Sequence, residues 1–393
     1  MSSPSTTDSR TLEDAFVLPT YAKFPFALAR GEGCRVWDED GVEYLDLYGG
    51  HAVAALGHSP AEVVDAIAAQ ARRLLFYSNA VYSRVRAEAA EALVRFCGEP
   101  GAQVFFCNSG AEANENAMRV ARAVTGRARV VAAEGGFHGR TAAAIAAAGA
   151  KYRTGLSGLG ADVVHVPFGD LSAAAAALDG AAAFLLEPIQ SLAGATTASP
   201  EYLKGLEALC AAKGALLIFD EVQTGLGRVG APSARQLFGA RPHLQTFAKA
   251  LASGVPAGAV LAVPEVAAKV KPGQLGSTFG GGPLACAAIK ATVDAIASRR
   301  LGENAAAMEA LVRETFRLPG IVEIRGRGLL LGIVLDRPSK PVRDALLARR
   351  ILVGGADDPN VIRLLPPLIA GAAELGLLRE ALAEILSAAP AAR

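Results

Sequence analysis

Cysteine, tryptophan, long apolar runs and blocks of like charge are all scarce in this sequence. Its 393 residues include 5 cysteines and 1 tryptophan, and no two cysteines stand in a C-x-x-C spacing. An odd, scattered set of cysteines indicates neither a disulfide framework nor a zinc site, so we expect no metal and a reducing, cytoplasmic location. These residues are Cys34, Cys97, Cys107, Cys210 and Cys286.

Charge of one sign is also lacking. The chain carries 39 Lys plus Arg against 38 Asp plus Glu, a formal net charge of +1. Because nucleic acids and anionic membrane surfaces require clustered Lys and Arg, we expect neither as a partner, but small molecules and a second copy of the chain. The richest apolar stretch, 141–150, is too short to span a bilayer, and the first ten residues lack the apolar segment of a signal peptide. We expect the first dozen residues to form a loose tail.

What the sequence does contain is a regular alternation of apolar runs and Ala-rich helical stretches from about residue 60 to 265. Uninterrupted apolar runs are typical of parallel strands covered on both faces, and with 52% hydrophobic residues the chain can bury a large core. The middle of the chain is therefore predicted to be an α/β sheet domain. The predicted strands are 104–107, 130–132, 163–166, 184–186 and 216–219.

The two ends of the chain have a different pattern. After residue 321 we predict strands at 322–325 and 329–335, a helix at 342–350, strands near Leu352 and Ile362, and a last helix at 373–386. The segment 35–47 alternates around an Asp-Gly turn, which indicates a hairpin that joins this C-terminal part. We place the domain limits at 1–50 for a tail and part of the small domain, 51–289 for a large domain and 290–393 for the rest of the small domain.

Local signals also mark helix starts. Ser59, Pro60 and Glu62 have the spacing of an N-cap, a first-turn proline and a capping-box carboxylate, so a helix is predicted from there to about residue 76.

Three features in the middle of the chain could carry chemistry. Asp220 directly follows a buried strand, where open α/β sheets bind ligands, although a lone strand-end carboxylate is more often a helix cap or turn residue. Lys249 follows the run 244–248; alone it would more often be a solvated lysine. The segment 108–112, N-S-G-A-E, opens a helix with Gly110, where amides and the helix dipole favour a phosphate. A Ser109/Glu112 capping box without a ligand is an equally good interpretation.

Two glycine-rich segments are weaker signals. The segment 276–283, G-S-T-F-G-G-G-P, is by itself only a flexible loop. The segment 225–230, G-L-G-R-V-G, matches the dinucleotide fingerprint by letter, but Pro232 stands where its helix should run and no acidic residue near position 250 could bind a ribose. We therefore reject a nicotinamide site there.

The helix start, the strand-end carboxylate and the later lysine together resemble a pyridoxal phosphate site, and longer motifs make the resemblance specific. From about Tyr21 to Leu386 the chain resembles the class III (ω-) aminotransferases of fold type I, most of all their acetylornithine-type members. This resemblance implies a large, mixed, mainly parallel sheet domain and a smaller α+β domain built from both chain ends. The matching motifs are N-S-G-A-E-A-N-E at 108–115, F-H-G-R-T at 137–141, E-P-I-Q at 187–190, L-I-F-D-E-V-Q-T-G-L-G-R at 217–228, F-A-K-A-L at 247–251, G-S-T-F-G-G at 276–281, R-G-R-G-L at 325–329 and R-L-L-P-P-L at 363–368.

The resemblance also implies a role for each matched residue. Lys249 would bind pyridoxal 5'-phosphate covalently and then move a proton, and Asp220 would pair with the pyridine nitrogen. Arg140 and Arg363 would bind substrate carboxylates, since a guanidinium holds a carboxylate with two parallel hydrogen bonds. The remaining implied contacts are Phe137 and Val222 on the two ring faces, Gln223 at the phenolic oxygen, Ser109, Gly110 and Ala111 at the phosphate, and Thr278 at the phosphate of the neighbouring subunit in a homodimer with shared sites.

The substrate positions depart from the family. After E-P-I-Q the family usually has Gly-Glu, whose carboxylate neutralises the second arginine, whereas this chain has Ser191 and Leu192. Arg363 then needs compensation by water, another carboxylate or a donor with its own distal anion. His51 replaces an aliphatic residue of acetylornithine enzymes, and Tyr21 matches a pocket tyrosine of ornithine enzymes.

The function implied is transfer of the terminal amino group of N2-acetylornithine or a related ω-amino acid to 2-oxoglutarate, as in arginine biosynthesis. Ornithine, lysine or γ-aminobutyrate are alternative donors. There are three other hypotheses: a mutase, decarboxylase or racemase of the same fold, a nicotinamide oxidoreductase, and a non-catalytic binding protein. The paired arginines favour transamination over the other reactions of this fold. The joint presence of Lys249, Asp220, Gln223 and Phe137 disfavours a non-catalytic protein.

Overall fold

A computed structural model describes residues 8–155 and 162–388 of the chain. Its centre is a seven-stranded sheet in the order β4-β12-β11-β10-β7-β5-β6. The strands are β4 (Gln103–Cys107), β5 (Val130–Ala133), β6 (Val163–Val166), β7 (Ala183–Leu186), β10 (Leu216–Asp220), β11 (Leu244–Phe247) and β12 (Gly258–Ala262). All pairings are parallel except those of β12 with β11 and β4. The predicted α/β sheet and its five strands are confirmed.

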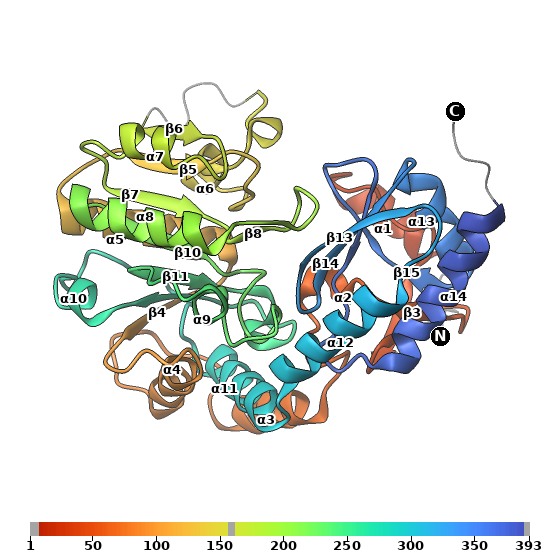
Figure 1. The fold of residues 1–393 in the computed structure, drawn as a ribbon. Coiled ribbons are helices and arrows are strands. Elements are labelled where there is room, and N and C mark those ends of the chain that lie inside the picture. Colours follow the sequence, from red (N-terminus) through yellow and green to blue (C-terminus); the bar gives the residue numbers. More distant parts are fainter. Residues whose placement is uncertain (1–7, 156–161, 389–393) are drawn as a thin grey trace.

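The apolar runs form strands because both faces of the sheet are covered. In β7 and β10, Phe184 and Phe219 pack into one hydrophobic cluster while Leu185 and Ile218 pack into the opposite one. Alternate side chains point to opposite faces, so a strand buried on both sides must be apolar at every position. Helices α5 (Gly110–Thr125) and α8 (Pro200–Lys213) pack on this sheet, as Figure 1 shows.

Further helices and one short strand pair lie between residues 49 and 298. These are α2 (Gly49–Ala52), α3 (Ala61–Arg73), α4 (Arg84–Phe96), α6 (Ala142–Ala147), α7 (Leu171–Ala177), α9 (Ala234–Phe238), α10 (Pro264–Ala267), α11 (Pro283–Ser298), η1 (Ala150–Tyr152) and η2 (Lys249–Ala252), with the short pair β8 (Ile189–Gln190) and β9 (Thr196–Thr197). No helix begins within 225–230, since α9 starts at Ala234, which agrees with the rejection of a dinucleotide site there.

Both ends of the chain build the smaller part of the molecule, on the right of Figure 1. The hairpin β2 (Arg35–Asp38) and β3 (Glu43–Asp46) extends β1 (Leu28–Glu32), and β3 pairs in parallel with β15 (Ile351–Leu352). A second sheet has the order β13-β14-β17-β16, and three helices complete this part. The strands of this sheet are β13 (Ile321–Arg327), β14 (Leu330–Leu335), β16 (Gly354–Gly355) and β17 (Val361–Leu364). The helices are α12 (Leu301–Thr315), α13 (Ser339–Ala348) and α14 (Ala372–Ala388). The predicted joining of segment 35–47 to the C-terminal part is confirmed, whereas the domain limits at 50 and 289 stay predictions.

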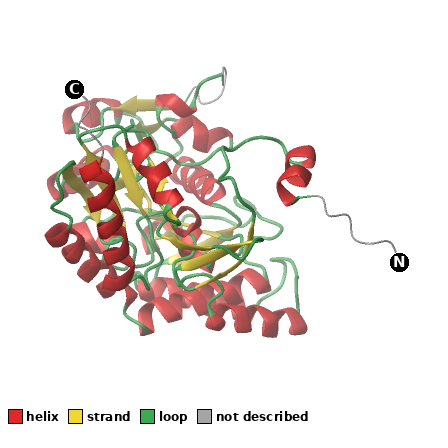
Figure 2. Cartoon of the chain, turned by 90° about the vertical axis from the view of Figure 1, so that its right-hand side faces the viewer, coloured by secondary structure: helices red, strands yellow, loops and turns green. Residues whose placement is uncertain are grey.

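Two local predictions are wrong. Ser59 does not cap a helix, because its backbone is left-handed (φ 50°); Pro60 takes the N-cap position without a side-chain bond, and α3 ends at Arg73 rather than near residue 76. Glu62 lies instead 3.2 Å from the Arg299 guanidinium. The N-terminal segment is not wholly loose, since Ser9–Phe16 form helix α1, capped by the Asp8 carboxylate. In Figure 2 this exposed helix stands away from the body of the protein; residues 1–7 lie outside the described part.

Within the described residues, no helix has both the length and the apolar character needed to cross a bilayer. The five cysteines are all buried and unpaired.

Candidate active site

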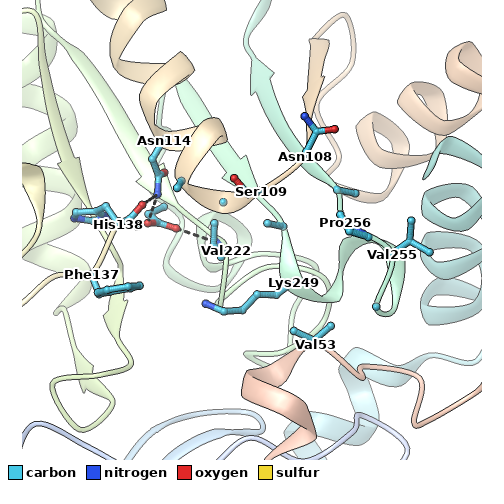
Figure 3. A pocket seen from close by; sticks show the side chains of 17 residues that line it. Val53, Asn108, Ser109, Asn114, Phe137, His138, Val222, Lys249, Val255 and Pro256 are labelled. Atoms are coloured by element: carbon cyan, nitrogen blue, oxygen red, sulfur yellow. Dashed lines mark hydrogen bonds and ion pairs between the residues drawn. The ribbon is translucent and has the colours of Figure 1, made fainter. Parts of the chain in front are cut away.

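The carboxyl ends of five strands, β4, β5, β7, β10 and β11, lead into the candidate site. This is the edge where parallel sheets place their ligands. A cavity of about 340 Å³ lies there, and Figure 3 shows Lys249 extending between Val222 and Val53 with its amine directed toward Phe137. Of the predicted residues, it brings together Ser109, Gly110, Ala111, Phe137, Asp220, Val222 and Lys249.

Asp220 ends β10 and is only 2% exposed. Its Oδ1 accepts a hydrogen bond from the Val222 amide (3.0 Å), and its Oδ2 accepts from Asn114 Nδ2 (2.7 Å) and lies 2.8 Å from His138 Nδ1. A buried carboxylate costs much free energy unless its oxygens are bonded, and these donors meet that need. The alternative of a surface turn is thereby excluded.

Lys249 follows β11 and is half-buried at the cavity. Burial lowers the pKa of its amine to about 8, although the carboxylates of Asp220 and Glu187 act in the opposite direction. Its backbone has a φ of 44°, a conformation that non-glycine residues seldom adopt and that is enriched at functional sites. Lys249 is therefore not a solvated surface lysine but a half-buried amine of lowered pKa.

Helix α5 begins at the cavity. Ser109 is its N-cap, with Oγ accepting from the Glu112 amide (3.1 Å), and Glu112 in turn accepts from the Asn108 amide (3.0 Å). A Cβ on Gly110 would lie 3.0 Å from Val222 Cγ2, so this position needs glycine for packing as well as for backbone access. The Ser109 cap does not close this helix start to a ligand, since Gly110 and Ala111 still line the cavity.

The backbone of Phe137 is hydrogen-bonded to a buried acid, Glu187. Its amide donates to Glu187 Oε1 (2.7 Å), and burial together with the charge of Asp220 raises the pKa of Glu187 to about 7. The Phe137 ring meets the Tyr152 ring edge-on, with centroids 4.9 Å apart. Arg140 is exposed and lies over both rings, 5.6 Å and 5.7 Å from their centroids.

Arg363 comes from the small part of the molecule, in β17, and is 3% exposed. Its Nη1 donates to Ser191 Oγ (3.0 Å), whose hydroxyl donates to Gln223 Oε1 (3.1 Å). Leu192 is half-buried beside Ser191, and its carbonyl accepts from the Asp357 amide (2.8 Å). Burial is the main cause of the lowered pKa of His51 and of Lys249, and the nearby charge of Arg363 lowers both further.

Three predicted residues lie at the margin. Tyr21 is 73% exposed and Thr278 is exposed in the loop before α11, and neither lines the cavity. The His51 ring contacts the Tyr48 ring in a tilted arrangement, with centroids 4.6 Å apart, and burial lowers the pKa of its imidazole.

Sequence reasoning missed the residues that hold the predicted ones in place: Asn114, His138, Glu187, Ser191 and Tyr48. The first three stand inside the motifs 108–115, 137–141 and 187–190, so their positions were visible as part of a match although no role was assigned to them. Ser191 adjoins the predicted departure at Leu192. Across residues 8–155 and 162–388 there is no cluster of three or more His, Cys, Asp or Glu side chains that could bind a metal ion.

The side chains around the cavity suit one cofactor. A half-buried amine of lowered pKa can bind an aldehyde, a bonded carboxylate at the bottom can pair with a protonated pyridine, and a capped helix start can bind a phosphate. Together with the mainly parallel sheet and the two-part fold, this donor set defines a fold type I, pyridoxal-phosphate-dependent transferase.

The chain belongs to the class-III aminotransferases, whose family model matches residues 17–386. It is 41% identical to the acetylornithine aminotransferase of Methanothermobacter thermautotrophicus over 96% of this chain and 97% of that protein. Identity to the acetylornithine aminotransferase of Streptomyces coelicolor is 46% over 88% of this chain and 87% of that protein. The predicted family and its cofactor class are confirmed.

Solved structures give the same result. The ornithine aminotransferase of Toxoplasma gondii has a TM-score of 0.91 at 31% identity, covering 97% of this chain and 94% of that one. The acetylornithine aminotransferase of Elizabethkingia anophelis has a TM-score of 0.85 at 30% identity, covering 98% and 100%.

Proposed function

We propose that this aminotransferase moves the terminal amino group of N2-acetylornithine, or a related ω-amino acid, to 2-oxoglutarate, giving a semialdehyde and glutamate. The reaction serves amino-acid metabolism, of which arginine biosynthesis is one route. The observation that carries the proposal is the joint placement of Lys249 and Asp220 at one cavity beside the start of α5. Relatives of 41% to 46% identity named acetylornithine aminotransferases support the donor.

Pyridoxal phosphate, when bound, supplies an electron sink for the negative charge left when a proton leaves the substrate carbon. Lys249 would hold it covalently in the resting enzyme, and Asp220 would keep its pyridine nitrogen protonated. Phe137 and Val222 would flank the ring, Gln223 would meet the phenolic oxygen, and Ser109, Gly110 and Ala111 would bind the phosphate.

The chain's own residues then perform the proton transfer. With a pKa near 8, the Lys249 amine is partly neutral at physiological pH and can accept a proton from the substrate carbon and deliver it again. Asn114 and His138 contact the Asp220 carboxylate and would hold its orientation during the reaction. Arg140 and Arg363 would bind carboxylates of donor and acceptor, with His51 and Leu192 near Arg363. Tyr21 lies outside the cavity of its own subunit, so its predicted contact with the substrate would need a different arrangement of the N-terminal segment.

We further propose a homodimer, in which Thr278 reaches the phosphate site of the partner. Exposed apolar side chains gather near that loop: Phe279 is 66% exposed, and its ring contacts the Phe76 ring at a tilt, with 5.3 Å between centroids. The neighbouring segment is fastened to the loop, because Asn79 Nδ2 donates to the carbonyls of Ser277 (3.0 Å) and Gly280 (2.9 Å). Large exposed apolar patches favour an interface between chains. Sedimentation of the purified protein tests this: a single monomeric species at micromolar concentration would contradict it. A cytoplasmic location is part of the same proposal.

The absorbance of the pyridoxal-loaded protein during single half-reactions tests the function. Acetylornithine, ornithine, lysine, γ-aminobutyrate, diaminopimelate and glutamate are each added without a keto acid. We expect acetylornithine and glutamate to convert the cofactor to its amine form fastest. Lys249→Ala should abolish conversion while leaving the fold intact; full activity in that variant would contradict the assignment.

A further inference from the structure

The guanidinium of Arg363 is surrounded by neutral acceptors. Nε donates to the Gly355 carbonyl (2.5 Å), Nη1 to Ser191 Oγ (3.0 Å) and Nη2, over a longer 3.4 Å, to the Tyr48 hydroxyl. An arginine carries five N–H donors, so these bonds leave donors on both terminal nitrogens. Among the described residues no carboxylate lies within 4.0 Å of it.

The acids of the neighbourhood are engaged elsewhere. Glu187 accepts from the amides of Phe137 (2.7 Å) and Ser191 (3.5 Å). Asp357 accepts from the Tyr152 hydroxyl (2.7 Å) and from Lys151 Nζ (2.8 Å). Both act on Arg363 only through space, and burial lowers the pKa of its guanidinium.

Ser191 is the residue that joins this arginine to the rest of the site. It is fully buried, and its hydroxyl has one proton and two lone pairs. The hydroxyl donates its proton to Gln223 Oε1 (3.1 Å) and accepts a hydrogen bond from Arg363 Nη1. It therefore acts as donor and acceptor at once, and the two bonds fix its orientation. Rotation of the hydroxyl would break one of the two bonds.

We propose that Ser191 is a positioning residue that holds the Arg363 guanidinium by a neutral hydrogen bond, leaving its charge free to bind a substrate carboxylate at all stages of the reaction. The inference rests on the proposed function and deepens it. Because a buried cation without a counter-ion is costly, an arriving carboxylate is favoured by the attraction and by the relief of that cost. The substrates of the proposed reaction with a second carboxylate for this subsite are glutamate and 2-oxoglutarate.

The probe is glutarate, a dicarboxylate with neither an amino nor a keto group. Its binding to the pyridoxal-loaded enzyme is measured by isothermal titration calorimetry, and KM and kcat for 2-oxoglutarate are measured alongside. Ser191→Ala should weaken glutarate about tenfold and raise KM similarly, with kcat changed less than about threefold, as loss of one hydrogen bond to a charged group implies. Ser191→Thr, which keeps the hydroxyl, should restore binding.

Ser298→Ala is the matched control, since its hydroxyl bonds the Ala295 carbonyl at the end of α11, away from the cavity. If Ser191→Ala does not fold, Ser191→Gly removes the same hydroxyl. Unchanged glutarate affinity in a folded variant without the hydroxyl would overturn the inference, as would a fall in kcat with KM unchanged. A wild type that binds glutarate but transfers no amino group would instead overturn the proposed function.

Discussion

Asn114 donates to the Oδ2 atom of Asp220 over 2.7 Å, and the two side chains are 1% and 2% exposed. Asn114 is itself fixed, because its Oδ1 accepts from Thr246 Oγ1 (2.7 Å) and its Nδ2 also donates to the His138 carbonyl (2.8 Å). The beginning of α5 thus serves two parts of the cavity. Asn114 orients the Asp220 carboxylate, and the helix start at Ser109 to Ala111 faces the proposed phosphate position.

Asn114→Ala should lower kcat. Removing a buried hydrogen bond to a charged group costs roughly 1.5 to 3 kcal/mol, which corresponds to about a tenfold to hundredfold loss if it is felt in the transition state. Steady-state kinetics with a saturating donor measure it. Asn116→Ala is the control, since the Asn116 side chain donates to the Glu112 carbonyl on the same helix. Equal effects of the two changes would show that Asp220 does not depend on Asn114.

The apoenzyme should combine with pyridoxal phosphate faster as the pH rises. Only the neutral amine is a nucleophile, and burial holds the pKa of Lys249 at about 8. The covalent step should therefore accelerate about tenfold per pH unit below that value and level off above it. Stopped-flow absorbance follows the reaction, with Lys249→Ala as the blank. A rate that still climbs above pH 10 would indicate an ordinary lysine.

Leu192→Glu should place an acid beside Arg363 and slow the half-reaction of glutamate relative to that of acetylornithine. The carboxylate would compete with the substrate for the same guanidinium, and we expect the ratio of the two rates to change by roughly tenfold. Leu192→Gln, of similar size but uncharged, is the control. A ratio that is the same in wild type and both variants would contradict this account of the departure from the family.

Tyr152→Phe should reduce stability more than Lys151→Met, although both side chains bond Asp357. The Tyr152 hydroxyl is half-buried and lies 2.9 Å and 2.7 Å from the two carboxylate oxygens, whereas the Lys151 side chain is 67% exposed. We expect about 1 to 2 kcal/mol for the tyrosine and at most about 1 kcal/mol for the lysine. Urea unfolding gives both values; the reverse order would refute the ranking.

The strands, the family and the cofactor-facing residues could be predicted because each is encoded in a short stretch of sequence. Asp220 and Lys249 each follow an apolar run directly, and this spacing predicts that they stand at strand ends. Ser59 shows where short sequence patterns are insufficient. Its spacing to Pro60 and Glu62 fits an N-cap, but its backbone is left-handed and its hydroxyl does not cap α3.

The partners of Arg363 could not be predicted for a different reason. Gly355 lies in β16, which pairs with β17 in the same sheet, but Tyr48 and Ser191 are brought to Arg363 from distant parts of the chain by the tertiary fold. No periodicity or spacing encodes such a meeting. The sequence showed that a carboxylate was absent at Leu192, and only the fold shows which neutral atoms take its place.

The parallel pairing of β3 with β15 leads us to expect an order for folding. Leu45 and Asp46 pair with Ile351 and Leu352, more than 300 residues later in the chain. Closing so long a loop is slow, and during synthesis the early hairpin has no edge to join until nearly the whole polypeptide has left the ribosome. The large sheet, whose strands all lie between residues 103 and 262, has every partner much sooner. A chain cut short before Ile351 would therefore keep the cofactor-facing strands while leaving its first hairpin as an unpaired edge, exposed to other chains.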